Sequence, residues 1–262
     1  MGRFHRHDDG TVHTHDHDEH GHEHHDHGDH GDHSGYETGS QRIDVLESIF
    51  AENDVRADYN RKAFESNGIR ALNLMSSPGS GKTTVLGATL DELAGEFAVG
   101  VIEGDIATDL DAAKLGGRGA QISLLNTGNG FGGECHLDAP MVNRALQGLD
   151  LPQLDLVIIE NVGNLVCPAE FDVGEHAKAM VYSVTEGDDK PLKYPVMFRA
   201  VDVVLLNKID LVPYLDVDVD AYLARVREVN PTATILPVSA RTGAGMSAWF
   251  GWLRRFMAAS AA

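Results

Sequence analysis

The chain has 262 residues, and its 40 acidic against 21 basic residues give a formal net charge of −19. A chain this acidic lacks the basic surface that nucleic acids and anionic membranes require, so we exclude both as main partners. Two cysteines are too few for a disulfide framework, which indicates a reducing compartment. No apolar run approaches the ~18–20 residues of a membrane span, and no apolar stretch follows a basic start. We therefore expect a cytoplasmic protein.

Residues 1–40 are rich in His, Asp, Glu and Gly, and they contain most of the 14 histidines. With almost nothing apolar to bury, this segment cannot offset the entropy of ordering, so we predict a disordered tail. Its His-x-His and His-x-x-His spacings offer imidazoles that suit Ni, Zn, Cu and Co. The alternatives are a purification tag, which would be a uniform His run, and a solubilising tail, which would not need histidines. The expected tail ligands are His13, His15, His17, His20, His22, His24, His25, His27, His30 and His33.

A leading amphipathic helix is predicted over residues 41–68. It is predicted to start at a cap on Ser40 and to end near Gly68, a residue type that commonly terminates helices. Three- and four-residue steps are typical of one helix face. The stripe with these steps consists of Ile43, Leu46, Phe50, Asn53, Ala57, Asn60 and Phe64.

Residues 69–262 are predicted to form one α/β domain with a doubly wound, mostly parallel sheet. Continuous β-branched apolar runs are typical of buried parallel strands, and the lengths between them suit crossover helices. The expected strands are Ala71–Met75, Val99–Glu103, Ile122–Leu125, Leu156–Glu160, Ala179–Val184, Val203–Leu206 and Thr234–Val238. The last helix is expected to pack against the core through Met246, Trp249, Phe250, Leu253 and Met257.

A glycine-rich loop separates the first of these strands from a helix that is expected to open at Lys82. It fits the phosphate-binding P-loop pattern except that Ser76 replaces the first glycine. Backbone N–H groups and the helix N-terminus would bind phosphate, Lys82 would reach the β- and γ-phosphates, and Thr83 would ligate Mg²⁺. The alternative is an ordinary Gly/Ser turn. The predicted nucleotide-binding residues of this loop are Pro78, Gly79, Ser80, Gly81, Lys82, Thr83 and Thr84.

A second motif, Asn207-Lys208-Ile209-Asp210, follows a later predicted strand. The Asp210 carboxylate can accept both the N1–H and the exocyclic N–H of guanine, a donor pair that adenine does not offer. Ser239 and Ala240 follow the last predicted strand and offer a backbone contact to the guanine carbonyl. The motif therefore favours GTP over ATP.

Two carboxylates are candidates for the metal side of the phosphates. Glu160 ends a strand and precedes Gly163, a candidate sensor of the γ-phosphate, while Asp105 follows another strand. With Thr83 they are the predicted Mg²⁺ ligands, and with Lys82 they are the predicted catalytic residues. The alternative for either carboxylate is a solvated charge at a strand end. No glutamine is placed to orient water, so we expect slow GTP hydrolysis.

Cys135, His136 and Cys167 form a second candidate metal site. Two thiolates and an imidazole are soft ligands for a transition metal, but three ligands leave a tetrahedral site incomplete without water or a partner chain. Both cysteines are expected at the carboxyl edge of the sheet, on the side of the phosphates. The alternative is a pair of unrelated buried thiols.

These segments together carry a family resemblance over residues 41–262. The chain closely resembles the HypB-type hydrogenase nickel-incorporation GTPases in Asn73–Thr84, Ile102–Asp109, the glycine-rich loop through His136, Glu160–Glu175 and Asn207–Asp210. The resemblance implies a GTPase that forms a homodimer around nucleotide, with Ni²⁺ or Zn²⁺ bound near that interface by Cys135, His136 and Cys167. It also implies a nickel-transferring accessory protein and the hydrogenase large subunit as partners. The cysteine-rich amino-terminal motif of some members is missing, and the His-rich tail looks like its substitute.

The expected function is a GTP-hydrolysing metallochaperone that stores nickel and delivers it during [NiFe]-hydrogenase maturation, gated by GTP binding and dimerisation. One alternative is a urease-type nickel-insertion GTPase, whose Cys-Pro-His triplet is incomplete here because Ala169 follows Pro168. Another is a nickel or zinc storage protein with a secondary GTPase activity. A translation or signalling GTPase would have no use for so many histidines.

Overall fold

The computed structural model describes residues 5–6, 12–13, 38–104, 115–125, 136–164 and 166–259, with side chains from residue 50 onward except that of residue 167. The chain divides into two compact units, Met1–Ile43 and Asp44–Ala262. In the first, β1 (His5–Arg6) pairs antiparallel with β2 (Val12–His13). The rest of the predicted tail lies outside the described residues. Within the described ranges, no helix is long and apolar enough to cross a membrane.

The second unit is built on a sheet of seven strands in the order β5-β4-β6-β3-β7-β8-β9, and every neighbouring pair is parallel. All seven predicted apolar runs form strands, which confirms the doubly wound α/β fold. The strands are β3 (Arg70–Ser76), β4 (Val99–Glu103), β5 (Gln121–Leu124), β6 (Leu156–Gly163), β7 (Ala177–Ser183), β8 (Val203–Asn207) and β9 (Thr234–Pro237).

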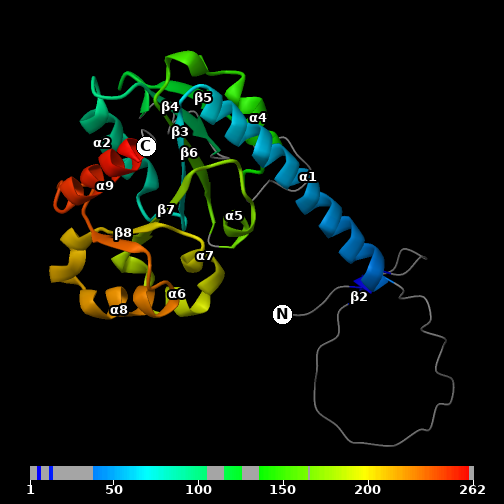
Figure 1. The fold of residues 1–262 in the computed structure, drawn as a ribbon. Coiled ribbons are helices and arrows are strands. Elements are labelled where there is room, and N and C mark those ends of the chain that lie inside the picture. The colour runs from blue at the N-terminus through cyan, green and yellow to red at the C-terminus, as the bar shows by residue number, and fades with distance from the viewer. Residues whose placement is uncertain are drawn as a thin grey trace, which may run out of the picture. The chain divides into compact units, whose positions relative to one another are not determined.

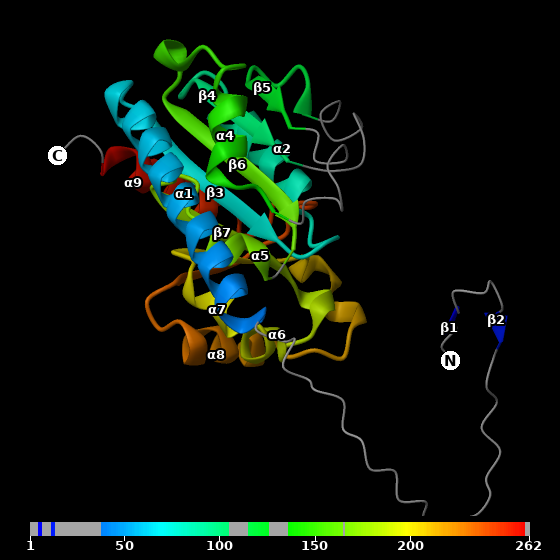
Figure 2. The same cartoon turned by 90° about the vertical axis from the view of Figure 1, so that its right-hand side faces the viewer.

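Helices cover both faces of this sheet (Figures 1 and 2). The α-helices are α1 (Thr38–Ser66), α2 (Lys82–Leu93), α4 (Ala139–Leu146), α5 (Cys167–Glu170), α6 (Lys190–Lys193), α7 (Pro195–Arg199), α8 (Val219–Val229) and α9 (Met246–Ala258). Short 3₁₀ helices are η2 (Leu151–Gln153), η3 (Val184–Glu186) and η4 (Ile209–Tyr214).

The alternation of side chains along β3 decides which helices pack on which face. Leu72 and Leu74 point into a core shared with α2 and α9, whereas Ala71 and Met75 point to the opposite face. That face is covered by α1 and α4 over one half and by α7 and α8 over the other, as Figure 2 shows for α1 and α4. Because both faces are covered, the central strands β3 and β6 are buried along almost their whole length.

The two amphipathic helices that the sequence predicts both pack against the sheet. In α1, Ala57 and Phe64 are buried, and the amides Asn53 and Asn60 of the same stripe are buried with them. In α9, the predicted core residues Met246, Trp249 and Leu253 are buried, while Phe250 and Met257 are partly buried against the same core.

Candidate functional site

The loop between β3 and α2 has the backbone that a phosphate-binding loop requires. Gly81, the residue before α2, has a φ of 98°, which lies in the left-handed region that favours glycine. A Cβ atom at Gly81 would lie 2.6 Å from Nδ2 of Asn207. That amide donates to the carbonyl oxygen of Ser80 at 2.9 Å, so the end of β8 is hydrogen-bonded to the loop.

Glu160 of β6 lies beside the start of α2. Its Oε1 is 2.6 Å from Nζ of Lys82 and accepts a hydrogen bond from the Thr83 hydroxyl at 2.9 Å. The carboxylate is 1% exposed, and its Oε2 has no hydrogen-bond partner in the described part of the chain. A hydroxyl beside a carboxylate with an unused buried oxygen is the hard oxygen donor set that Mg²⁺ prefers. These residues therefore fit a magnesium ion.

The end of β6 also packs on the phosphate loop. A Cβ atom at Gly163 would lie 3.2 Å from Cα of Pro78, so this strand end is in close contact with the loop and any side chain here would require Pro78 to shift. Four positions after Gly163, helix α5 begins at Cys167. One strand therefore leads from the carboxylate at Lys82 to a predicted metal ligand.

A cavity of about 370 Å³ lies beside the loop, within the size range of small-molecule sites. Its rim is organised by hydrogen bonds. Asp210 accepts from the Ser239 hydroxyl at 2.6 Å, the N–H of Ala240 donates to Oδ1 of Asn207 at 3.0 Å, and Nζ of Lys208 donates to the Gly79 carbonyl at 2.5 Å. The lining residues are Gly81, Thr84, Asn207, Lys208, Asp210, Leu211, Ala240 and Arg241.

Glu186 in η3 is a residue of this site that sequence reasoning missed. Its Oε2 accepts a hydrogen bond from the hydroxyl of Ser77 in the phosphate loop, and its Oε1 accepts from the N–H of Ser183 at 2.9 Å. Burial raises the pKa of Glu186, although the hydrogen bond from Ser77 opposes that shift. The signal in the sequence is the capping-box spacing of Ser183 and Glu186, which the structure forms.

The predicted transition-metal residues are only partly within the described chain. Cys135 lies outside it, and Cys167 is described by its backbone alone. The His136 ring stacks on Phe171 with centroids 4.1 Å apart, so His136 lies next to the segment that follows α5. Among the residues described, no three His, Cys, Asp or Glu side chains are grouped to hold a metal ion.

Comparisons with known proteins assign the chain to one family. The model of the CobW/HypB/UreG nucleotide-binding domain matches residues 70–237. Hydrogenase maturation factor HypB from Azotobacter vinelandii is 50% identical over 216 residues, which cover 82% of this chain and 70% of that protein. The chain belongs to the HypB group of P-loop GTPases. This confirms the recognition made from the sequence motifs.

Two solved HypB structures share the fold of the described chain. The crystal structure of HypB from Archaeoglobus fulgidus has a TM-score of 0.73 at 37% identity, covering 79% of this chain and 99% of that chain. The crystal structure of HypB from Helicobacter pylori in complex with nickel also has a TM-score of 0.73, at 36% identity, covering 79% and 95%. The described chain therefore has the fold of solved HypB proteins, in agreement with the family assignment from sequence.

The structure of this HypB-type GTPase brings together the predicted nucleotide-site residues that it describes. The phosphate loop, Glu160, Gly163 and the segment from Asn207 to Asp210 with Ser239 and Ala240 lie together around the loop and cavity. Asp105 and the predicted tail ligands lie outside the residues whose side chains are described. Leu211 and Arg241 line the cavity without having been predicted, because neither belongs to a recognisable motif.

Proposed function

We propose that this chain is a GTP-hydrolysing nickel metallochaperone that acts in the maturation of [NiFe]-hydrogenase. The observation that carries the proposal is the course of β6, which runs from Glu160 beside Lys82 to Gly163 on the phosphate loop and then leads to Cys167. The names of the HypB relatives, hydrogenase maturation factors, and the nickel in the H. pylori complex support the assignment.

On the nucleotide side, each residue is proposed to bind a different part of GTP or the magnesium ion. Lys82 binds the β- and γ-phosphates and Asp210 accepts the two guanine N–H donors. Thr83 and Glu160 would hold Mg²⁺, with Asp105 as the further carboxylate proposed for the metal or the attacking water. When bound, Mg²⁺ neutralises charge on the phosphate oxygens. Because the nucleotide motifs of the sequence contain no glutamine to orient water, we expect slow unassisted hydrolysis, which suits a timing role.

On the metal side, Cys135, His136 and Cys167 are proposed to bind the Ni²⁺ cargo, with Zn²⁺ as a competing ion. GTP can control this site only if nickel binds one nucleotide state more tightly than the other. GTP-favoured dimerisation supplies such a difference, because a second chain or water must complete the three-ligand set. An accessory nickel carrier and the hydrogenase large subunit are the proposed partners, and the cytoplasm is the proposed compartment.

The His-rich tail is proposed as a separate nickel store. Imidazoles bind metal only when they are neutral, so the tail should hold much less nickel at pH 5 than at pH 7.5. Equilibrium dialysis of the full chain at these two values tests this role, and equal stoichiometries would contradict it.

The experiment that tests the function is a nickel titration of the full chain with GDP and with a non-hydrolysable GTP analogue. Thiolate-to-nickel charge-transfer absorption reports on the cysteine site, and light scattering reports on mass. A nucleotide-dependent nickel affinity that is lost in Cys167→Ser supports a gated carrier. Equal affinities in both nucleotide states would contradict gating, and would leave the GTPase and the tail as separate activities.

A further inference from the structure

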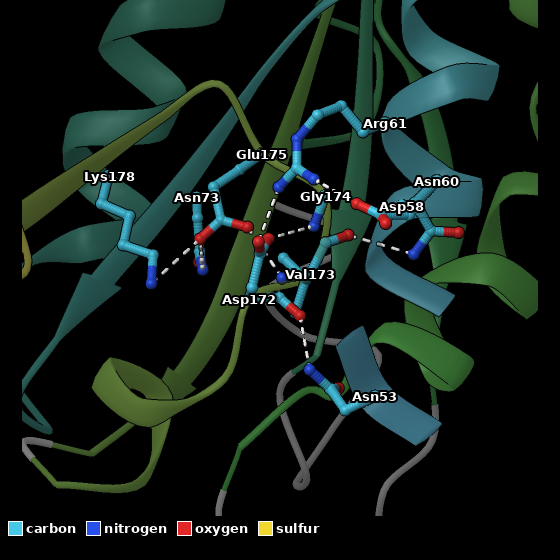
Figure 3. Close-up of polar contacts among 10 residues, drawn as sticks. All are labelled: Asn53, Asp58, Asn60, Arg61, Asn73, Asp172, Val173, Gly174, Glu175 and Lys178. Atoms are coloured by element: carbon cyan, nitrogen blue, oxygen red, sulfur yellow. Dashed lines mark hydrogen bonds and ion pairs between the residues drawn. The ribbon is translucent and has the colours of Figure 1, made fainter. Parts of the chain in front are cut away.

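Helix α1 presents two buried amides to the rest of the domain. Asn53 and Asn60 lie two turns apart on the same face and are 3% and 0% exposed. Figure 3 shows both side chains pointing from α1 toward the segment Asp172–Glu175. A buried amide without hydrogen bonds is destabilising, so the hydrogen-bond partners of these two side chains show which parts of the chain they fix in place. We call Asn53 and Asn60 the α1 amide pair.

Each amide of the pair binds the same two chain segments. Oδ1 of Asn53 accepts from the N–H of Ala139 at 2.9 Å, and its Nδ2 donates to the carbonyl of Asp172 at 2.8 Å. Nδ2 of Asn60 donates to the carbonyls of Ala139 and Val173 at 2.9 and 3.0 Å. The α1 amide pair therefore fixes the backbone at Ala139 and at Asp172–Val173 relative to one another.

A row of aromatic rings joins the same three parts of the chain. Phe50 of α1 lies against Phe171, with centroids 5.2 Å apart, and Phe171 stacks on His136 at 4.1 Å. An ion pair between Arg61 and Asp172, with N and O 2.6 Å apart, adds a further link from α1. The segments at 136–139 and 171–173 are thus held to α1 by hydrogen bonds, ring stacking and charge.

The same two segments are also tied to β6 from the side of the nucleotide site. Asn161, which follows Glu160, accepts a hydrogen bond from the N–H of Leu137 at 3.0 Å. Its Nδ2 donates to Asn73 at 3.3 Å, and Asn73 in turn donates to Glu175 at 3.3 Å. These side chains are all buried, so the backbone next to His136 is held between α1 and β6.

We propose that Asn53 and Asn60 are positioning residues for the transition-metal site. The inference rests on the proposed metal role of Cys135, His136 and Cys167. His136 precedes Ala139 by three residues, and α5, which begins at Cys167, ends one residue before Phe171. Ligand atoms must converge to ~2.0–2.3 Å from a metal ion, so the relative position of these two segments sets the affinity. Each amide of the pair contacts both segments at once.

The test is a nickel titration of full-length Asn53→Ala and Asn60→Ala, with free Ni²⁺ set by a chelator buffer. The readout is thiolate-to-nickel charge-transfer absorption. This band requires a thiolate ligand, and the two cysteines of the chain, Cys135 and Cys167, lie outside the tail. Nickel bound by tail histidines therefore does not contribute to it. We expect nickel affinity about tenfold weaker in each variant, the order found when groups that orient metal ligands are removed. GDP affinity should stay within about twofold.

A matched control is Asn230→Ala. Asn230 is also a buried amide, and its Nδ2 donates to the carbonyls of Phe198 and Val201, both at 2.9 Å, in a different part of the core. Its removal should lower the melting temperature to a similar extent while leaving the charge-transfer band and nickel affinity unchanged. Asn53→Ser, which keeps one polar atom, is the milder variant to use if Asn53→Ala does not fold.

Two results would overturn the proposal, and they are distinguishable. If the α1 variants lose melting temperature like Asn230→Ala but bind nickel like the wild type, the amide pair has only a structural role. If the wild type itself shows no thiolate-to-nickel band, the proposed metal site fails and the role of the pair fails with it. Weakened binding confined to the α1 variants, with an altered band, supports the proposal.

Discussion

The nucleotide side and the metal side of this domain are built by different means. The phosphate loop, the Asn207–Asp210 segment and Ser239-Ala240 are short motifs, and each places its own groups at the end of a strand. By contrast, the α1 amide pair reaches residues 79 to 119 positions away. Each motif carries its functional groups within one short segment, although contacts such as that of Asn207 with Ser80 join the motifs to one another. The segment next to His136 has no such motif and takes its position from α1 and β6.

If the nucleotide motifs act locally, Lys82→Ala should have the largest effect on GTP chemistry. Lys82 lies at the start of α2 with its Nζ 2.6 Å from Oε1 of Glu160, and its ammonium group is proposed to bind the β- and γ-phosphates. Loss of one such group should lower the rate of phosphate release from GTP at least about 100-fold. Lys62→Ala, which removes an exposed lysine of α1, is the control. Hydrolysis at the wild-type rate in Lys82→Ala would refute the P-loop assignment.

The next largest effect should come from Asp210→Ala. Asp210 lines the cavity and accepts from Ser239, which orients its carboxylate. Removing a charged hydrogen-bond acceptor for guanine should cost about 1.5–3 kcal/mol, or roughly 10–100-fold in GDP affinity. Fluorescence titration with labelled GDP and ADP measures it. Weak ADP binding should not change, and a parallel loss for both nucleotides would argue against base recognition.

Alanine substitutions at two glycines of the phosphate loop distinguish the cost of a positive φ from the cost of a steric clash. Gly79 and Gly81 both have positive φ, but a Cβ atom meets nothing within 4 Å at Gly79 and lies 2.6 Å from Asn207 at Gly81. Gly79→Ala should cost about 1–2 kcal/mol of unfolding free energy, and Gly81→Ala up to about 3 kcal/mol. Urea unfolding measures both. Equal losses of unfolding free energy would mean that the Asn207 side chain moves away at no cost and that its hydrogen bond does not stabilise the loop.

The smallest expected effect is a change in pH dependence through Glu186. Burial raises its folded pKa above 4.5, so the folded protein keeps this proton at pH values where the unfolded chain has lost it. The contribution of Glu186 to stability is therefore present below pH 4.5 and falls as pH rises through the folded pKa. Glu186→Gln should remove that fall. Denaturant unfolding of both proteins from pH 4 to 8 tests this, and parallel curves would contradict it.

The sequence alone determined the elements of this protein whose signals are local. Seven buried apolar runs predict seven strands because each strand is continuous in the chain, and the start of α2 at Lys82 follows from the glycine loop before it. The guanine motif and the family resemblance can also be read from the sequence, since the residues within each motif are neighbours in the chain. Even the buried amides Asn53 and Asn60 were visible in the helical stripe, although their partners were not.

Only the tertiary structure decided which distant groups meet. Nothing in the spacing of Ser77 and Glu186 indicates their hydrogen bond, because the adjacency of β3 and β7 brings them together. The same holds for Asn53 with Asp172 and for His136 with Phe171. Local patterns record helical and strand periodicity, but a contact between residues far apart in the chain depends on strand order and helix packing. In this protein, that packing joins α1 to the backbone beside the proposed nickel ligands.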